Sequence, residues 1–144
     1  MLRMLVLMAL AVVVAACHSP SGGQTAPADL TVTYRKTGGF LPFDDTFVVR
    51  GDGALTHTGR DRTTREARVA PADLARLRSL LSSPEYRAAA GEYRNDRGAD
   101  LVTHRIESRL GGETKTAVVM TATEHPKVLD QVIDELERLA AMTK

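Results

Sequence analysis

The order of apolar and polar side chains predicts six strands. Apolar and polar residues alternate from Leu30 to Tyr34, which is typical of a strand with one buried face. Gly51-Asp52-Gly53 and Gly111-Gly112 are strong turn sequences, so each predicts a hairpin between the segments that flank it. The predicted strands are residues 30–35, 46–50, 54–59, 62–69, 101–110 and 114–120, with a loop at 40–45 and an irregular segment at 91–100.

Two longer segments have the periodicity of amphipathic helices. Leucines recur at three- and four-residue spacing in residues 71–82, where Pro71 suits a first helical position. A short helical turn follows from Ser83. Residues 126–142 carry one apolar stripe, and we expect Asp134, Glu135, Glu137 and Arg138 to cover the opposite side. The predicted class is α+β: a mostly antiparallel β-sheet with an amphipathic helix between hairpins and a C-terminal helix packed on one face.

The first segment differs from the rest of the chain. Residues 1–16 contain one charge, Arg3, and an apolar run too short to cross a bilayer of about 30 Å, as in a signal peptide. The junction Val14-Ala15-Ala16-Cys17 resembles a bacterial lipobox, which implies that Cys17 is acylated. An ordinary signal peptide beside an unrelated cysteine is the alternative. Residues 17–28 then read as the lipidated cysteine and a flexible Gly/Ser/Pro tether, and 29–144 as a single α+β domain.

Composition narrows the function classes. The chain has 19 basic and 18 acidic side chains, so a nucleic-acid partner is not expected. A single cysteine excludes an internal disulfide framework and a cysteine-rich zinc site. We expect no cofactor and no metal. With the lipobox, the sequence predicts an exported envelope protein whose partner is the lipid bilayer through Cys17. It would lie on the outer membrane or on the outer face of the cell membrane.

Catalytic patterns are scarce in this sequence. Neither HExxH nor GxSxG occurs, which argues against an enzyme of those classes, and we expect no catalytic residue. His104 is expected to be a partly buried histidine hydrogen-bonded within the sheet, and His57 a surface histidine without an acidic partner. The adjacent Asp44 and Asp45 are expected to lie in a solvated loop rather than to bind a metal.

One segment stands out as a contact surface. Residues 38–45 place three bulky apolar side chains between two flexible glycines and two carboxylates. These side chains either fold under to cap the core or are displayed to a partner, and the sequence leaves both possibilities open. The candidate partner-binding residues are Gly38, Gly39, Phe40, Leu41, Phe43, Asp44 and Asp45.

The order of these motifs resembles the emfourin family of small proteins that inhibit thermolysin-like zinc metallopeptidases. The resemblance covers about residues 30–140 and rests on Tyr34-x-x-x-Gly38-Gly39-Phe40, on Ala99-Asp100-Leu101 and on the terminal amphipathic helix. It implies a helix packed on an antiparallel sheet and a non-enzymatic inhibitor whose partner is a secreted or periplasmic metallopeptidase. The alternative is an envelope module that binds another protein or a small ligand, or that has a structural role.

Overall fold

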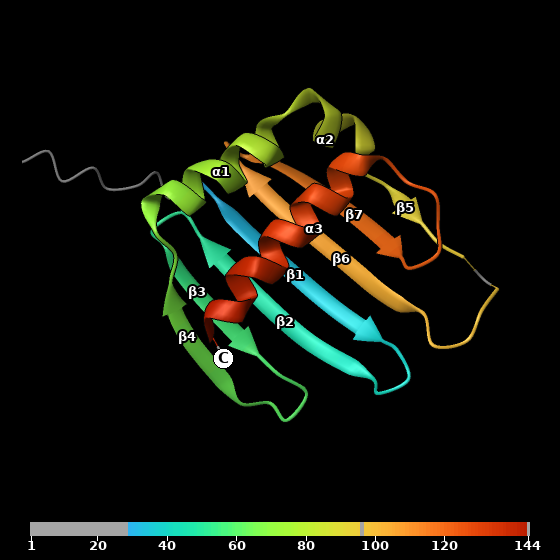
Figure 1. Ribbon diagram of the computed structural model, residues 1–144. Coiled ribbons are helices and arrows are strands. Elements are labelled where there is room, and N and C mark those ends of the chain that lie inside the picture. Colours follow the sequence, from blue (N-terminus) through green and yellow to red (C-terminus); the bar gives the residue numbers. More distant parts are fainter. Residues whose placement is uncertain (1–28, 96, 144) are drawn as a thin grey trace, which may run out of the picture.

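A seven-stranded sheet with three helices on one face forms the fold (Figure 1). The computed structural model describes residues 29–95 and 97–143, so the expected signal peptide, Cys17 and the tether lie outside the described residues. The strands are β1 (Thr31–Gly38), β2 (Phe43–Arg50), β3 (Ala54–Thr58), β4 (Thr64–Arg68), β5 (Glu92–Tyr93), β6 (Val102–Leu110) and β7 (Glu113–Met120). The helices are α1 (Pro71–Ser82), α2 (Pro84–Ala89) and α3 (Lys127–Ala140), followed by the 3-10 turn η1 (Ala141–Thr143). This architecture confirms the predicted α+β class.

The sheet order is β4-β3-β2-β1-β6-β7-β5, with β1 at its centre. All neighbours are antiparallel except β5, which pairs in parallel with β7. The expectation of an irregular segment at 91–100 was therefore wrong at Glu92 and Tyr93. Two residues are too few to give an alternating pattern, and their pairing with Val118 and Val119 arises only in the folded chain.

The core lies between the helices and the inner face of the sheet. Alternate strand residues face this side because successive side chains of a strand point to opposite faces. Leu74, Leu77 and Leu81 of α1 are buried there, as their spacing predicts. The largest fully buried side chains are Tyr34, Tyr86, Leu30, Leu55, Leu77, Ile106, Leu129, Leu136 and Leu139. All of these lie within residues 30–139, so we expect a fragment such as 24–144 to fold by itself.

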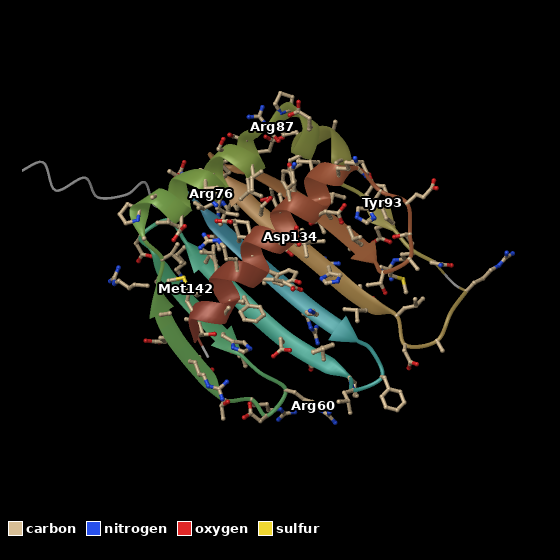
Figure 2. The ribbon with its side chains drawn as sticks, in the orientation of Figure 1. Arg60, Arg76, Arg87, Tyr93, Asp134 and Met142 are labelled. Carbon is tan, nitrogen blue, oxygen red and sulfur yellow. The ribbon has the colours of Figure 1, made fainter. Side chains whose placement is uncertain are left out.

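Helix α3 departs from its predicted polar face at one position. Glu135, expected on the solvent side, is buried, and Arg138 donates to both of its carboxylate oxygens at 2.7 and 3.0 Å. Arg138 also binds Asp73 of α1 at 2.5 Å. These bonds raise the pKa of Arg138 above its ordinary value. The contact between Arg138 and Asp73 joins α3 to α1. Asp134, in contrast, points away from the sheet (Figure 2).

Two glycines connect β1 to the turn at 39–42. Gly38 has φ +90°, and a Cβ built there would lie 2.3 Å from the carbonyl oxygen of Leu101, which accepts a hydrogen bond from Gly39. A side chain at this position must therefore displace backbone of the neighbouring strand.

Gly38→Ala is expected to lower the free energy of unfolding by about 2 kcal/mol, from the positive φ and the backbone contact together. Gly91→Ala, where an added Cβ meets nothing within 4 Å, serves as the control and should cost less than about 0.5 kcal/mol. Urea unfolding of both variants measures the difference. Equal stability of the two would show that the close approach at Gly38 carries no cost.

Candidate functional site

The turn between β1 and β2 displays apolar side chains to solvent. Phe40 is 83% exposed and Leu41 74%, the two largest exposures of bulky apolar side chains among the described residues, and Phe43 beside them is 42% exposed. We call Phe40, Leu41 and Phe43 the tip. The question that the sequence left open is thus answered, because the tip does not cap the core. Exposed apolar groups gathered on one turn are typical of a contact surface.

Strand β2 begins earlier than the sequence predicted. The expected loop at 40–45 ends at Pro42, and Phe43, Asp44 and Asp45 pair with β1. The two carboxylates consequently point to opposite faces of the sheet. Asp44 accepts from Arg35 at 2.8 Å on the open face, and Asp45 lies 2.9 Å from His57 Nε2 on the helix face. Both aspartates of the candidate set are therefore held in intramolecular pairs at the base of the tip.

Behind the tip, four rings form a row across four strands. His57, Phe47, Tyr34 and His104 are stacked in that order, with ring centroids 4.2, 5.8 and 6.0 Å apart. Strand register produces the row, because Phe47 pairs with both Tyr34 and His57. Packed rings of this kind stabilise a sheet beyond their buried area. The strands that carry the tip thus continue into the packed core.

Tyr34 connects the row to helix α3. Its hydroxyl donates to Glu137 Oε1 at 3.0 Å and lies 2.7 Å from His104 Nδ1. Since the phenol has one proton, the Tyr34 oxygen accepts from His104, which fixes Nδ1–H on the neutral imidazole. Lys36 donates to the same Glu137 oxygen at 2.8 Å and places its ammonium 4.9 Å from the ring centroid of Phe43. A chain of polar contacts therefore runs from His104 to the tip.

Burial and charge shift the titration of this network. Desolvation, together with the nearby Glu137 carboxylate, raises the pKa of the Tyr34 hydroxyl above its ordinary value. Desolvation would also raise the pKa of Glu137, but hydrogen bonds from Lys36 and Tyr34 outweigh it, so that pKa is lowered. The pKa of His104 is lowered because burial opposes its charged form more than Glu137 favours it. At neutral pH these groups are a phenol, a carboxylate and a neutral imidazole.

The structure also corrects the expectation for His57. We expected a surface histidine without an acidic partner, yet the ring is buried and contacts Asp45 through Nε2 and Thr143 Oγ1 through Nδ1 at 3.1 Å. The arrangement has the residue types of an acid–histidine–hydroxyl triad. However, the Thr143 hydroxyl donates to the carbonyl oxygen of Ala140 at 2.8 Å and is itself buried. Its geometry fits the attachment of η1 to the sheet rather than nucleophilic attack.

His104, by contrast, matches its prediction as a buried histidine hydrogen-bonded within the sheet. The described residues contain no group of three or more side chains arranged to hold a metal ion. None of their helices has the length and apolar character needed to cross a bilayer.

The network lines a small depression beside the tip. Its volume is about 140 Å³, and its walls come from β1, β2, β3 and the end of α3. The principal lining side chains are Lys36, Phe43, Asp45, Phe47, His57 and Glu137. Sequence reasoning selected Phe43 and Asp45 but missed Lys36, Phe47 and Glu137, which join them only through strand register and helix packing.

The histidines predict a pH dependence of stability. A pKa lowered by folding means that the unfolded chain binds a proton first, so His104 makes the fold less stable as the pH falls below the ordinary value of about 6.5. His125 behaves oppositely: burial lowers its pKa, but the bonds to Asp130 and to the Thr123 carbonyl outweigh this and raise it. The stability contributed by His125 is full below about pH 6.5 and is lost as the pH rises through its folded pKa.

Urea unfolding at pH 5.5 and 7.5 separates these two effects. His104→Gln should reduce the acid-side loss of stability, by an amount limited to about 1.4 kcal/mol per pH unit. His125→Gln should instead enlarge the net loss on acidification, because it removes a stabilising proton. Equal pH dependence in both variants would contradict the assigned protonation states.

No family model, curated protein or solved structure matches this chain.

Proposed function

We propose that this chain is a bacterial envelope lipoprotein, anchored through acylated Cys17, whose non-enzymatic domain inhibits a thermolysin-like zinc metallopeptidase by contact through the tip. The observation that carries the proposal is the exposure of Phe40 and Leu41 on a turn between two paired strands. An apolar group presented in this way has a clear physical use, since it gains most when a partner removes it from water.

Strand pairing up to the base of the tip favours tight binding. Residues 39–42 are held between β1 and β2, whose pairing runs to Gly38 and Phe43. A pre-ordered loop loses little conformational freedom on association, so more of the apolar contact appears as affinity. Enzymes of the thermolysin type recognise a bulky apolar side chain next to the scissile bond, and Phe40 or Leu41 would fill that pocket. Asp44, about half exposed beside the tip, would face the cationic catalytic region.

The direction of β1 suits an anchored inhibitor. The described chain enters the fold at Asp29, and β1 then runs to the tip at the other end of the sheet (Figure 1). Eight strand residues at roughly 3.3 Å each separate the two ends by about 26 Å. A tether leading from Cys17 to Asp29 would hold one end near the lipid and leave the tip at the opposite end.

A ligand-binding module is the alternative, favoured by the depression beside the tip. Small-molecule sites usually have volumes of about 300–1,000 Å³, whereas this one measures about 140 Å³. That space accommodates a single side chain of a protein partner. The size of the depression therefore favours contact with a protein over binding of a small molecule.

Inhibition assays test the proposal. Residues 24–144, without the lipid anchor, would be added to a panel of thermolysin-like peptidases, with a serine peptidase as the control. The expected result is inhibition of at least one metallopeptidase at nanomolar to micromolar concentration and none of the control. Absence of inhibition at micromolar excess, with circular dichroism showing a folded domain, would reject the inhibitor assignment.

The anchor is tested separately by the intact mass of protein extracted from membranes. A mature chain that begins at Cys17 and carries a diacylglyceryl thioether is expected. A freely secreted chain with an unmodified thiol would refute the lipoprotein assignment.

A further inference from the structure

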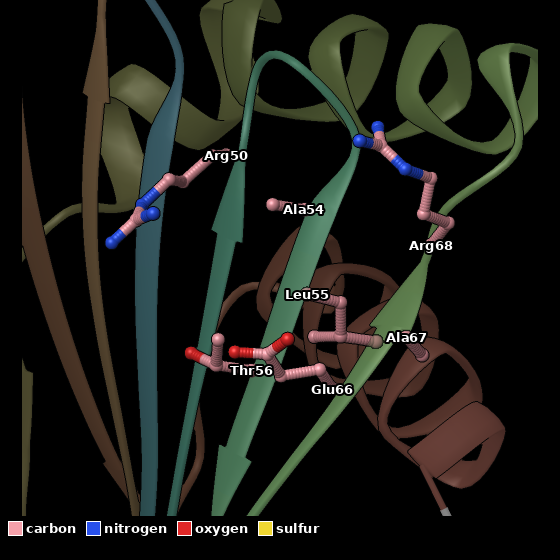
Figure 3. Close-up of a pocket in the computed structure, with 7 residues that line it drawn as sticks. All are labelled: Arg50, Ala54, Leu55, Thr56, Glu66, Ala67 and Arg68. Atoms are coloured by element: carbon pink, nitrogen blue, oxygen red, sulfur yellow. The ribbon is translucent and has the colours of Figure 1, made fainter.

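Three arginines lie in one cross-strand row on the face of the sheet away from the helices. Thr31, at the start of β1, pairs with Arg50 on one side and with Arg109 on the other. Arg68 pairs with Ala54 on the neighbouring strands. Figure 3 shows Arg50 and Arg68 on either side of Ala54, whose small side chain leaves a shallow hollow between them. We call Arg50, Arg68 and Arg109 the arginine row.

The row has uncompensated charge at the end of the sheet. Arg50 and Arg109 are exposed, and no ion pair within residues 29–95 and 97–143 engages either of them. Arg68 donates to the carbonyl oxygen of Asp52 and makes no ion pair in that part of the chain. The acidic side chains of the next row, Glu66 and Glu107, lie two residues further along their strands, roughly 6.6 Å towards the tip. Asp52 lies in the adjoining turn. The arginine row beside Thr31 is thus a positive patch that no ion pair of the described residues neutralises.

The row also lies where the chain enters the fold. Asp29 precedes Thr31 by two residues, and Cys17 lies twelve residues before Asp29. A random-coil chain of twelve residues would have a root-mean-square span of about 19 Å, and a fully extended one would reach at most about 43 Å. A lipid attached at Cys17 therefore keeps the row within reach of the bilayer surface.

We infer that the arginine row docks the domain on anionic phospholipid headgroups, with the tip directed away from the membrane. The inference rests on the proposed anchoring at Cys17 and does not require inhibitory activity. Guanidinium groups bind phosphate through paired N–H donors, which suits an array of headgroups. Each basic side chain near an anionic surface raises occupancy about fivefold, so the row gives on the order of 100-fold. This increase in occupancy would orient a domain that the lipid already holds at the membrane surface.

Bilayer nanodiscs provide the test. The chain 17–144 would be coupled through the thiol of its single cysteine to a maleimide lipid, so the result does not depend on acylation in the cell. Nanodiscs of phosphatidylcholine with or without 30% phosphatidylglycerol would contain a gadolinium lipid that broadens nearby amide signals. Phosphatidylglycerol is expected to increase the broadening of Thr31 several-fold over that of Phe40. Equal broadening of the two amides, or no effect of phosphatidylglycerol, would overturn the inference.

Two double variants carry the same change in charge. Arg50→Glu/Arg109→Glu should abolish the effect of phosphatidylglycerol. Arg60→Glu/Arg62→Glu should preserve it, because both side chains are exposed on the β3–β4 loop, and Figure 2 shows Arg60 at the tip end of the sheet. Equal loss in both variants would indicate a response to net charge and would refute docking through the row. The comparison of lipids in the unaltered chain decides the matter if a variant fails to fold.

Discussion

Replacing Phe40 and Leu41 together by alanine is expected to weaken the proposed inhibition of a metallopeptidase by on the order of 100-fold or more. Two anchors at the centre of a protein interface commonly contribute more than about 1 kcal/mol each, and effects of 2 kcal/mol or more are typical of the dominant ones. The free energy of unfolding should change by less than about 0.5 kcal/mol, since both side chains lie mostly in solvent. Inhibition constants and urea unfolding measure the two quantities on the same protein preparation.

The matched control for this variant is Phe47→Ala. Phe47 is buried between Tyr34 and His57, so its loss should cost about 3–5 kcal/mol of stability. Substitution of the tip should therefore change the inhibition constant, whereas substitution in the ring row should change the free energy of unfolding. Unchanged inhibition by the double variant would remove the tip from the interface. A stability loss of several kcal/mol would assign the tip to the core.

A second large effect on stability is expected at Tyr34. Tyr34→Ala should lower the free energy of unfolding by about 3–5 kcal/mol, because it opens a cavity between Phe47 and His104. It also leaves the Nδ1–H of His104 without its acceptor and removes one donor to Glu137. Such a loss approaches the whole stability of many small domains, so the variant is expected to be largely unfolded at elevated temperature.

Tyr34→Phe keeps the ring and isolates the hydroxyl. We expect a cost of about 1–3 kcal/mol, since a buried donor loses its acceptor and a charge-assisted bond disappears. Tyr86→Phe is the control, because the hydroxyl of Tyr86 has one neutral partner, Ser108, at 2.9 Å. Its cost should be nearer 1 kcal/mol. If urea unfolding showed a larger loss of stability for Tyr86→Phe than for Tyr34→Phe, the result would contradict the role assigned to the Glu137 network.

Periodicity sufficed for the long elements of this fold. The leucines of α1 and the alternation in β1 specify both the type of element and the side that it buries. Strand β5 could not be found in this way, because its two residues are stabilised by β7 and not by a local pattern. Glu135 was misassigned for a related reason. A carboxylate is expected on the solvent side of a helix unless a cation pairs with it. Arg138 pairs with Glu135 and also with Asp73 of α1, and the sequence does not show that α1 lies beside this part of α3.

The candidate site could be predicted only in part. The exposure of Phe40 was left open because apolar loop residues either cap a core or leave it, and composition does not distinguish the two. The pairing of Asp45 with His57 had a usable signal. The Gly51-Asp52-Gly53 turn sets a register that places Phe47 opposite His57, so Asp45 lies on the diagonal. Glu137, about a hundred residues from Tyr34 and Lys36, required the packing of α3 on the sheet.

The central claim is that this domain touches another protein with its tip while the opposite end is held at the membrane. Photo-crosslinking from position 40 in the full chain, expressed in its native cell, tests this claim most directly. A photoreactive phenylalanine derivative at that position should yield a discrete adduct with a zinc metallopeptidase, identified by mass spectrometry. The same group in place of Arg109 should give none. Absence of a protein adduct from position 40, or adducts with lipid alone, would contradict the account.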